Sequence, residues 1–219
     1  MRRTKAEALE TREALLDASE ALFVEKGVSG TSLTDIAKAA GLTRGAIYWH
    51  FADKAALFEA MQQRAWLPQE YVARLLEGTR TGDPLQAIHD VAIECLRNFA
   101  ADERSQRVYT IMLLRCEYVG EMSGVLQRMR EADKLLTGAV HAAFADAQAR
   151  GLLSENWTAE TASLAHISIV TGLFNQWLRG ERGFDLLEVG IPMLEAMRRA
   201  VSANVCVRQR DGLRRLAVG

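Results

Sequence analysis

Residues 43 to 54, TRGAIYWHFADK, place hydrogen-bonding and positively charged side chains beside aromatic rings in one short segment. Arg44 can bind a guanine edge with its forked guanidinium group. Tyr48 and His50 can form hydrogen bonds with phosphate oxygens, and Lys54 adds a positive charge beside them. Together these residue types can bind a large anionic partner such as nucleic acid.

Gly45 is unexpected in the helix that this segment predicts, because glycine costs about 1 kcal/mol of helix stability relative to alanine. Close approach of the backbone to another surface would account for it. If Ile47 is buried, the residues that point away from the core are Thr43, Arg44, Gly45, Tyr48 and part of Trp49. Two plainer interpretations stay open: Arg44 as a solvated surface charge, and Tyr48 and Phe51 as core aromatics. We expect Phe51 in the core and Tyr48 on the surface.

A helix-turn-helix motif over residues 33–51, LTDIAKAAGLTRGAIYWHF, would position this segment. Ala37 is small where two short helices cross, Gly41 tolerates a positive φ in the turn, and Ile47 anchors the second helix. Ser32 and Asp35 have the spacing of a capping box at the start of the first helix. This spacing is that of a DNA-reading motif.

The neighbouring segments carry further helix signals. A helix from Ala8 to Lys26 is followed by Gly27, Thr43 can cap the second helix of the motif, and Asp53 can cap a longer helix that starts at Lys54. Two exposed helix starts, at Ser32 and Lys54, can donate main-chain N–H groups to phosphate. The residues of a basic arm before the first helix are Arg2, Arg3 and Lys5.

The composition predicts an all-α protein. Of the 219 residues 49% are hydrophobic and only three are proline, and strong helix formers dominate long stretches. The net charge of −1 excludes a globally basic nucleic-acid binder, so any basic patch must be local. Cys95, Cys116 and Cys206 form no CxxC pair, which argues against a disulfide framework or a zinc site. The charged N-terminus lacks the apolar run of a signal peptide, and SLAHISIVTGLF (163–174) is too short to span a bilayer, so we expect a cytoplasmic protein without membrane contact.

The helical patterns are interrupted near 79–84, 101–105, 118–123, 151–158 and 179–184, where Gly, Pro, Asp, Ser or Asn cluster. We therefore expect about nine helices: an N-terminal three-helix helix-turn-helix domain, a connecting helix from Lys54 to about Thr79, and a bundle of about five further helices. The expected divisions are a DNA-binding domain over 1–53, a ligand-binding and dimerisation bundle over 54–205, and a basic tail over 206–219.

The second half predicts an apolar chamber suited to drug-like molecules, although an ordinary bundle core is about equally compatible with the pattern. The candidate lining residues are Leu67, Cys95, Phe99, Tyr109, Met112, Leu113, Cys116, Ile167, Val170, Thr171 and Phe174. His89, His141 and His166 each stand alone on their helices, without the spacing of a metal site. We expect no metal and no cofactor.

The run from Thr31 to Lys54, TSLTDIAKAAGLTRGAIYWHFADK, resembles the DNA-binding domain of the tetracycline-repressor-like (TetR) family. The opening RRTKAEALETREALLDASEALFVEKGV and, more weakly, QRVYTIMLLRCEYVGEM (106–122) resemble the branch that represses multidrug efflux pumps. The resemblance implies an all-helical homodimer, joined through its last two long helices and released from DNA by a small ligand in the C-terminal bundle. The DNA-contacting candidates that it implies are Ser32, Thr43, Arg44, Gly45, Tyr48, Trp49, His50 and Lys54.

The favoured hypothesis is a ligand-responsive repressor that binds a palindromic double-stranded DNA operator, with a hydrophobic or drug-like inducer. Its recognition helices would enter successive major grooves, and the helix from Lys54 would be the lever. Candidate dimer contacts are Leu186, Leu187, Val189, Leu194 and Met197. One alternative is a DNA-binding regulator whose bundle is structural or answers to a protein partner. Another is a helical-bundle enzyme, which the absence of a visible nucleophile–base spacing disfavours.

Overall fold

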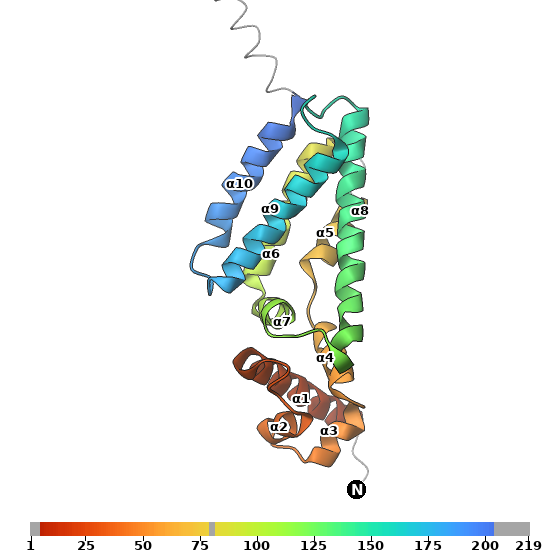
Figure 1. The fold of residues 1–219 in the computed structure, drawn as a ribbon, viewed down its shortest axis with the longest axis vertical. Helices are drawn as coiled ribbons and strands as arrows, with labels where there is room; N and C mark the ends of the chain where they lie inside the picture. The colour runs from red at the N-terminus through yellow and green to blue at the C-terminus, as the bar shows by residue number, and fades with distance from the viewer. Residues whose placement is uncertain (1–4, 79–81, 204–219) are drawn as a thin grey trace, which may run out of the picture. The chain divides into compact units, whose positions relative to one another are not determined.

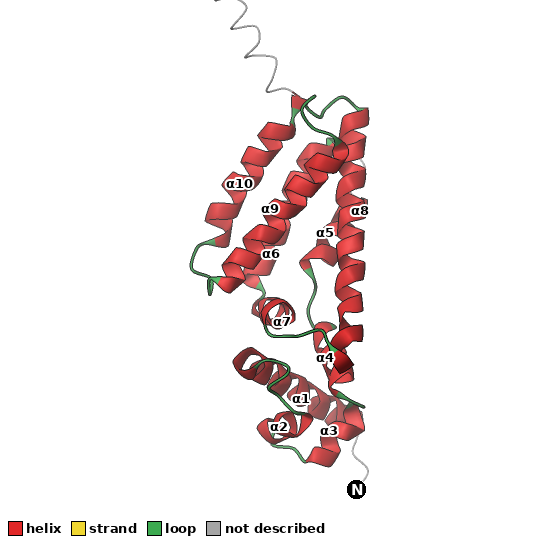
Figure 2. Ribbon diagram, viewed as in Figure 1, coloured by secondary structure: helices red, strands yellow, loops and turns green. Residues whose placement is uncertain are grey.

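The computed structural model describes residues 5–78 and 82–203, and these residues form ten α-helices, one 3₁₀ helix and no strand (Figures 1 and 2). The expected all-α fold is confirmed. The helices are α1 (Lys5–Lys26), α2 (Leu33–Ala39), α3 (Arg44–His50), α4 (Lys54–Gln62), α5 (Pro68–Gly78), α6 (Pro84–Ala101), α7 (Glu103–Leu114), η1 (Gly120–Leu126), α8 (Gln127–Ala149), α9 (Ala159–Arg179) and α10 (Leu186–Val201). The basic arm residues Arg2 and Arg3 and the expected tail over 206–219 lie outside the described residues.

Two compact units make up the chain. The first contains Met1–Leu67 and Asp102–Arg130, so the three N-terminal helices share it with α4, α7 and η1. The second contains Pro68–Ala101 and Glu131–Gly219. This division by packing differs from the expected division after residue 53, because α4 packs on α1 and on η1. The functional assignment of residues 54–205 stays a prediction.

The core of the first unit is built around α1. Leu15, Leu16 and Phe23 of this helix are fully buried, and α2, α3, α4 and α7 pack against it. The Phe23 ring lies 6.0 Å from the ring of Phe58 in α4. Burying large apolar side chains is the main stabilising contribution to such a unit. Helix α3 therefore packs against a well-filled core.

The core of the second unit lies among α6, α9 and α10, which run side by side in Figure 1. The Phe99 ring of α6 meets Phe174 of α9 at 4.7 Å between centroids and Trp177 at 6.1 Å. Gly190 allows α10 to approach α6 closely, since a Cβ atom there would lie 2.7 Å from a methyl carbon of Leu96. In the described residues of this unit, α8 and α5 flank a groove that is described below.

The expected connecting helix from Lys54 to about Thr79 is wrong. The structure has two helices there, because α4 ends at Gln62 and α5 begins at Pro68. Proline has no N–H group to bond the preceding turn, and it disfavours helical conformation in the residue before it. Pro68 therefore occupies the first position of a new helix, where a missing N–H is tolerated. This break accounts for ten α-helices where about nine were expected.

Candidate nucleic-acid interface

Local capping signals position α2 and α3. The Ser32 hydroxyl accepts a hydrogen bond from the Asp35 backbone N–H at 3.1 Å, and the Asp35 carboxylate accepts one from the Ser32 N–H at 3.0 Å. The Ser32 hydroxyl and the Ser32 N–H both donate to the Asp35 carboxylate, which holds the pKa of Asp35 below its usual value, so the carboxylate stays ionised at the N-terminal end of α2. Gly41 has φ +69° in the turn, and the Thr43 hydroxyl accepts from the Ala46 N–H at 3.3 Å to begin α3. The expected capping box, turn glycine and second cap are confirmed.

The inner face of the α2–α3 pair is buried as the spacing predicts. Ile36 and Ala37 of α2 and Ile47 of α3 are at most 1% exposed, and Phe51, which ends α3, is 3% exposed. The guanidinium carbon of Arg12 in α1 lies 5.4 Å from the centre of the Phe51 ring. Phe51 is therefore a core residue, as expected, and it fixes the rotation of α3 about its own axis.

The outer face of α3 is exposed and carries the groups that can read DNA. Trp49 is 74% exposed and Tyr48 is 47% exposed, which confirms Tyr48 as a surface residue. Thr43, Arg44 and Gly45 are also exposed, and His50 is half-buried with its ring 4.6 Å from that of Trp49. Among the described residues none forms an ion pair with Arg44, so its guanidinium group is available for a base edge.

Packing among the described residues does not require a glycine at position 45. A Cβ atom built on it would meet a single described atom within 4 Å, the Thr43 hydroxyl oxygen at 4.0 Å. Alanine would fit and would favour the helix, so the glycine is suited to a backbone that another molecule approaches closely. This observation supports the interpretation of the segment as a contact surface.

Lys54 differs from the other DNA-contacting candidates. Its ammonium group donates to the carbonyl oxygens of Val28 at 3.1 Å and Thr31 at 3.4 Å, and it lies 3.5 Å from the Glu121 carboxylate. The Lys54 side chain is only 16% exposed. The lysine thus ties the loop between α1 and α2 to η1, and its expected contact with DNA stays a prediction. Ser32 is exposed, although its side chain is engaged in the capping box.

The first unit contains a cluster of ion pairs around α1 that the sequence did not predict. Glu20 of α1 is 2% exposed, and its carboxylate lies 2.9 Å from Arg64 and 3.5 Å from Arg107 of α7. Burial raises the pKa of Glu20, while the charges of Arg64, Arg104 and Arg107 act in the opposite direction. Arg64 also pairs with Glu13 and Asp17, which lie on the same face of α1 as Glu20. The helical spacing of these three acidic residues could have predicted that they share one face of α1. Their basic partners lie far away in the sequence and could not be predicted in the same way.

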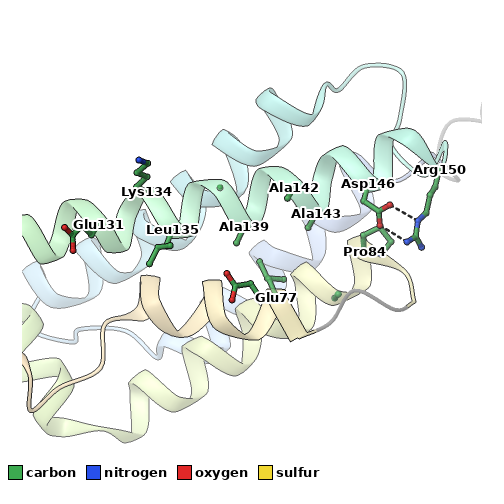
Figure 3. Close-up of a pocket in the computed structure, with 13 residues that line it drawn as sticks. Glu77, Pro84, Glu131, Lys134, Leu135, Ala139, Ala142, Ala143, Asp146 and Arg150 are labelled. Carbon is green, nitrogen blue, oxygen red and sulfur yellow. Dashed lines mark hydrogen bonds and ion pairs between the residues drawn. The ribbon is translucent and has the colours of Figure 1, made fainter.

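The second unit contains a groove of about 910 Å³, a size suited to a drug-like molecule (Figure 3). One wall is α8, whose small side chains leave room, and the other is formed by α5 and the start of α6. Leu135 and Ala139 of α8 and Glu77 of α5 point into the space between the helices. No described residue forms an ion pair with Glu77, whereas Asp146 and Arg150 neutralise each other at 2.8 Å. The lining residues are Leu76, Glu77, Pro84, Ala87, Glu131, Lys134, Leu135, Gly138, Ala139, Ala142, Ala143, Asp146 and Arg150.

None of the eleven expected ligand-binding residues lines this groove. Those in the second unit are Cys95, Phe99, Ile167, Val170, Thr171 and Phe174, and those in the first unit are Leu67, Tyr109, Met112, Leu113 and Cys116. Most are buried core residues, and two of those in the second unit, Phe99 and Phe174, pack against each other. The apolar residues on α6, α7 and α9 pack between helices, whereas small residues on α8 line the groove. The role of the eleven expected residues in ligand binding stays a prediction.

The expected dimer residues are also divided by the structure. Leu186, Leu194 and Met197 are buried within their own unit, Leu187 is half-buried, and Val189 is 39% exposed. Met193, one turn after Val189 on α10, is 42% exposed, and Leu164 on α9 is 68% exposed. These three are the exposed large apolar side chains of α9 and α10 among the described residues. No described helix is both long and apolar enough to cross a bilayer.

Comparisons with known proteins agree with this geometry. The family description "Bacterial regulatory proteins, tetR family" matches residues 15–61, and "MAATS-type transcriptional repressor, C-terminal region" matches residues 83–198. The HTH-type transcriptional repressor BepR of Brucella suis biovar 1 (strain 1330) is 43% identical over 211 residues, which are 95% of this chain and 100% of BepR.

Solved structures show the same arrangement of helices. NalD of Pseudomonas aeruginosa, described as the secondary repressor of the MexAB-OprM multidrug efflux pump, superposes with a TM-score of 0.78 at 38% identity, over 90% of this chain and 98% of that one. A complex of SmeT with triclosan superposes with a TM-score of 0.70 at 27% identity, over 88% and 92% of the two chains. SmeT is described as the repressor of the Stenotrophomonas maltophilia multidrug efflux pump SmeDEF.

Proposed function

The chain belongs to the tetR family of bacterial regulatory proteins, and we propose that it is a homodimeric repressor of a multidrug efflux pump operon. It binds a palindromic operator in the cytoplasm and leaves it when a small hydrophobic or drug-like molecule binds the second unit. The relatives named above are described as repressors, two of them of multidrug efflux pumps, which supports the regulated target.

The observation that carries the DNA-binding role is the exposed face of α3. Arg44 and Tyr48 lie on it beside a glycine that the chain's own packing does not require. We assign Arg44 to base-edge contacts, and Thr43, Tyr48, Trp49 and His50 to bases or phosphates. The N-terminus of α2, capped by Ser32, offers main-chain N–H groups to phosphate.

Dimerisation through α9 and α10 is supported by the large apolar side chains that these helices expose, Leu164, Val189 and Met193. A four-helix interface would bury these side chains, as in other symmetric helical dimers. Two copies of α3 would then meet half-sites about 34–36 Å apart on one face of the duplex.

The groove is the proposed inducer site. Its volume suits drug-sized molecules, its lining includes the apolar side chains of Leu76 and Ala139, and Glu77 offers a carboxylate without an ion-pair partner among the described residues. The triclosan complex of SmeT supports a small apolar aromatic ligand. The runner-up function, a regulator whose bundle is only structural or answers to a protein, would fit a bundle without such a groove.

Thiol protection tests the site. In a chain carrying Cys116→Ser and Cys206→Ser, the thiol introduced by Ala139→Cys reacts with a maleimide reagent, and we expect triclosan to slow this reaction and to weaken binding to DNA upstream of the gene. A thiol introduced by Thr137→Cys, on an exposed position of α8 outside the groove, is the control and should keep its rate. Release from DNA without protection of Ala139→Cys would place the inducer elsewhere.

A further inference from the structure

Arg128, in the first turn of α8, caps the C-terminal end of α4. Its guanidinium group donates to the backbone carbonyl of Gln62 and, at 3.2 Å, to that of Ala65. The last carbonyls of a helix have no partner within the helix, and a charged donor satisfies them strongly. The contact therefore fixes the end of α4 to the start of α8.

The other end of α4 is held by the segment just before α8. Lys54, its first residue, lies 3.5 Å from Glu121 of η1. The segment from Glu121 to Arg128 thus holds α4 at both ends. Because α3 ends at His50 and α4 begins four residues later, a change in the position of α4 is passed directly to the recognition helix.

Helix α8 continues without interruption from Gln127 to Ala149. Glu131, one turn after Arg128, is the first of its residues that line the groove, and Leu135, Ala139 and Ala143 follow along the same helix. No proline interrupts this helix, and its backbone hydrogen bonds oppose a sharp kink between the groove and Arg128. A ligand that displaces α8 in the groove therefore displaces the Arg128 guanidinium group as well.

The end of α4 also contains an unsatisfied polar group. Gln62 is 2% exposed, and its side-chain Nε2 atom has no hydrogen-bond partner among the described residues. A buried amide without a partner costs free energy. The packing at the end of α4 therefore leaves free energy that a small shift of the helix could recover.

We propose that Arg128 is the positioning residue that couples the inducer groove to the DNA-binding helices. The inference rests on the proposed function, since it deepens how ligand binding weakens operator binding. In the free protein Arg128 holds α4 in the position that fits the operator. When the groove is occupied, α8 and Arg128 move together and draw α4 and α3 away from that position.

A covalent probe in the groove tests this without knowledge of the natural inducer. The parent chain carries Cys116→Ser, Cys206→Ser and Ala139→Cys, and a bulky fluorescein maleimide on the introduced thiol fills the groove. Operator affinity is measured before and after labelling in the parent, in the parent with Arg128→Gln, and in the parent with Arg130→Gln. Arg130 is exposed on the same turn of α8, and no described residue forms an ion pair with it.

We expect labelling to lower operator affinity about tenfold or more in the parent and in the Arg130→Gln chain, a typical coupling between two sites. In the Arg128→Gln chain the labelled and unlabelled forms should bind alike. Hydrogen exchange of the amides near residues 60–66 should also respond to labelling in the parent and not in Arg128→Gln, a readout that a simple loss of stability would not produce.

If labelling lowers operator affinity equally in the Arg128→Gln and parent chains, Arg128 does not carry the coupling, although the groove still regulates DNA binding. If labelling lowers operator affinity in none of the chains, the groove does not control DNA binding, and Arg128 cannot couple the two. If labelling leaves the parent's operator affinity unchanged while triclosan still releases the parent from DNA, the inducer site lies elsewhere. That result also overturns the inference.

Discussion

The guanidinium carbon of Arg44 lies 5.5 Å from the centre of the Tyr48 ring, one turn further along α3. A cation held over an aromatic face at this distance is attracted to it, so the ring restrains the long arginine side chain. Restraint before binding lowers the conformational entropy that is lost on binding. The two residues therefore form a preorganised pair on the face that we assign to DNA.

Replacing Gly45 by alanine should stabilise the protein and weaken its binding to DNA. Helix α3 gains up to about 1 kcal/mol because alanine favours the helix and the new methyl group meets open space. The same methyl group obstructs the approach of the backbone to the duplex. Thermal unfolding and operator titration measure the two effects in one preparation.

Gly138→Ala is the matched control for that substitution, because Gly138 is exposed in the interior of α8 with no described atom near its Cβ position. It should raise stability without changing operator affinity in the absence of ligand. If Gly45→Ala binds the operator as tightly as the parent, close approach at Gly45 is not the reason for the glycine.

Lys54→Met should lower the stability of the first unit, since the carbonyl oxygens of Val28 and Thr31 lose their donor. A hydrogen bond to a charged donor contributes about 1.5–3 kcal/mol. Because the ammonium group is held inside the protein, we expect the slope of log affinity against log salt to change by less than about one per protomer. A fall of one or more in the magnitude of that slope would show that Lys54 contacts phosphate.

Arg64→Met should destabilise the protein by about 3 kcal/mol, because it leaves the buried Glu20 carboxylate with only its more distant arginines. Glu13→Gln removes a half-exposed partner of the same arginine and should cost less than about 1 kcal/mol. Denaturant titrations give both values.

The Arg64→Met effect should depend on pH with a definite sign. Burial already raises the pKa of Glu20 in the folded state, and loss of Arg64 raises it further. The folded state then binds a proton more readily than the unfolded state, so the variant's deficit should be largest at neutral pH and shrink on acidification. A deficit that grows as the pH falls would contradict the assignment of Glu20 as the charge left without its partner.

His166 should make the parent protein less stable in mild acid. Burial, with a smaller contribution from the charge of His89, lowers the pKa of His166 to about 4 from the ordinary 6.5. The unfolded chain therefore takes up a proton below about pH 6.5 that the folded chain refuses, and stability falls by about 2 kcal/mol between about pH 7.5 and about pH 5.

Replacement by a neutral aromatic tests this, because His166 packs its ring 6.0 Å from that of Phe144. The His166→Phe variant should lose less stability than the parent over the same pH range. Identical pH dependence in the parent and His166→Phe would assign the acid sensitivity to other groups.

Much of the DNA-binding domain could be predicted because its signals are local. The Ser32–Asp35 box, the positive φ of Gly41 and the Thr43 cap each depend on residues within a few positions of one another. Burial of Ile47 and Phe51 follows from helical spacing alone. Pro68 was a local signal as well, and applying the rule for the residue before proline would have divided the connecting helix.

The contacts that connect distant segments could not be read in this way. Arg128 finds the carbonyl of Gln62 across 66 residues, and Arg64 finds Glu20 across 44. Such pairs depend on the packing of whole helices, which spacing along one segment does not specify. The groove was missed for a related reason: apolar periodicity marks residues that pack, whereas a groove is left where small residues such as Ala139 do not fill the space between helices.

Operator binding by Arg44→Ala tests the central claim most directly. A duplex enriched by the parent protein from a randomised library is titrated with the parent, Arg44→Ala and the control Arg130→Ala. Loss of a base-edge contact in each protomer should weaken Arg44→Ala by about tenfold or more, relax the base preference at the contacted position, and leave Arg130→Ala unchanged. Equal affinity and equal base preference for Arg44→Ala and the parent would contradict the assignment of α3 as the helix that reads DNA.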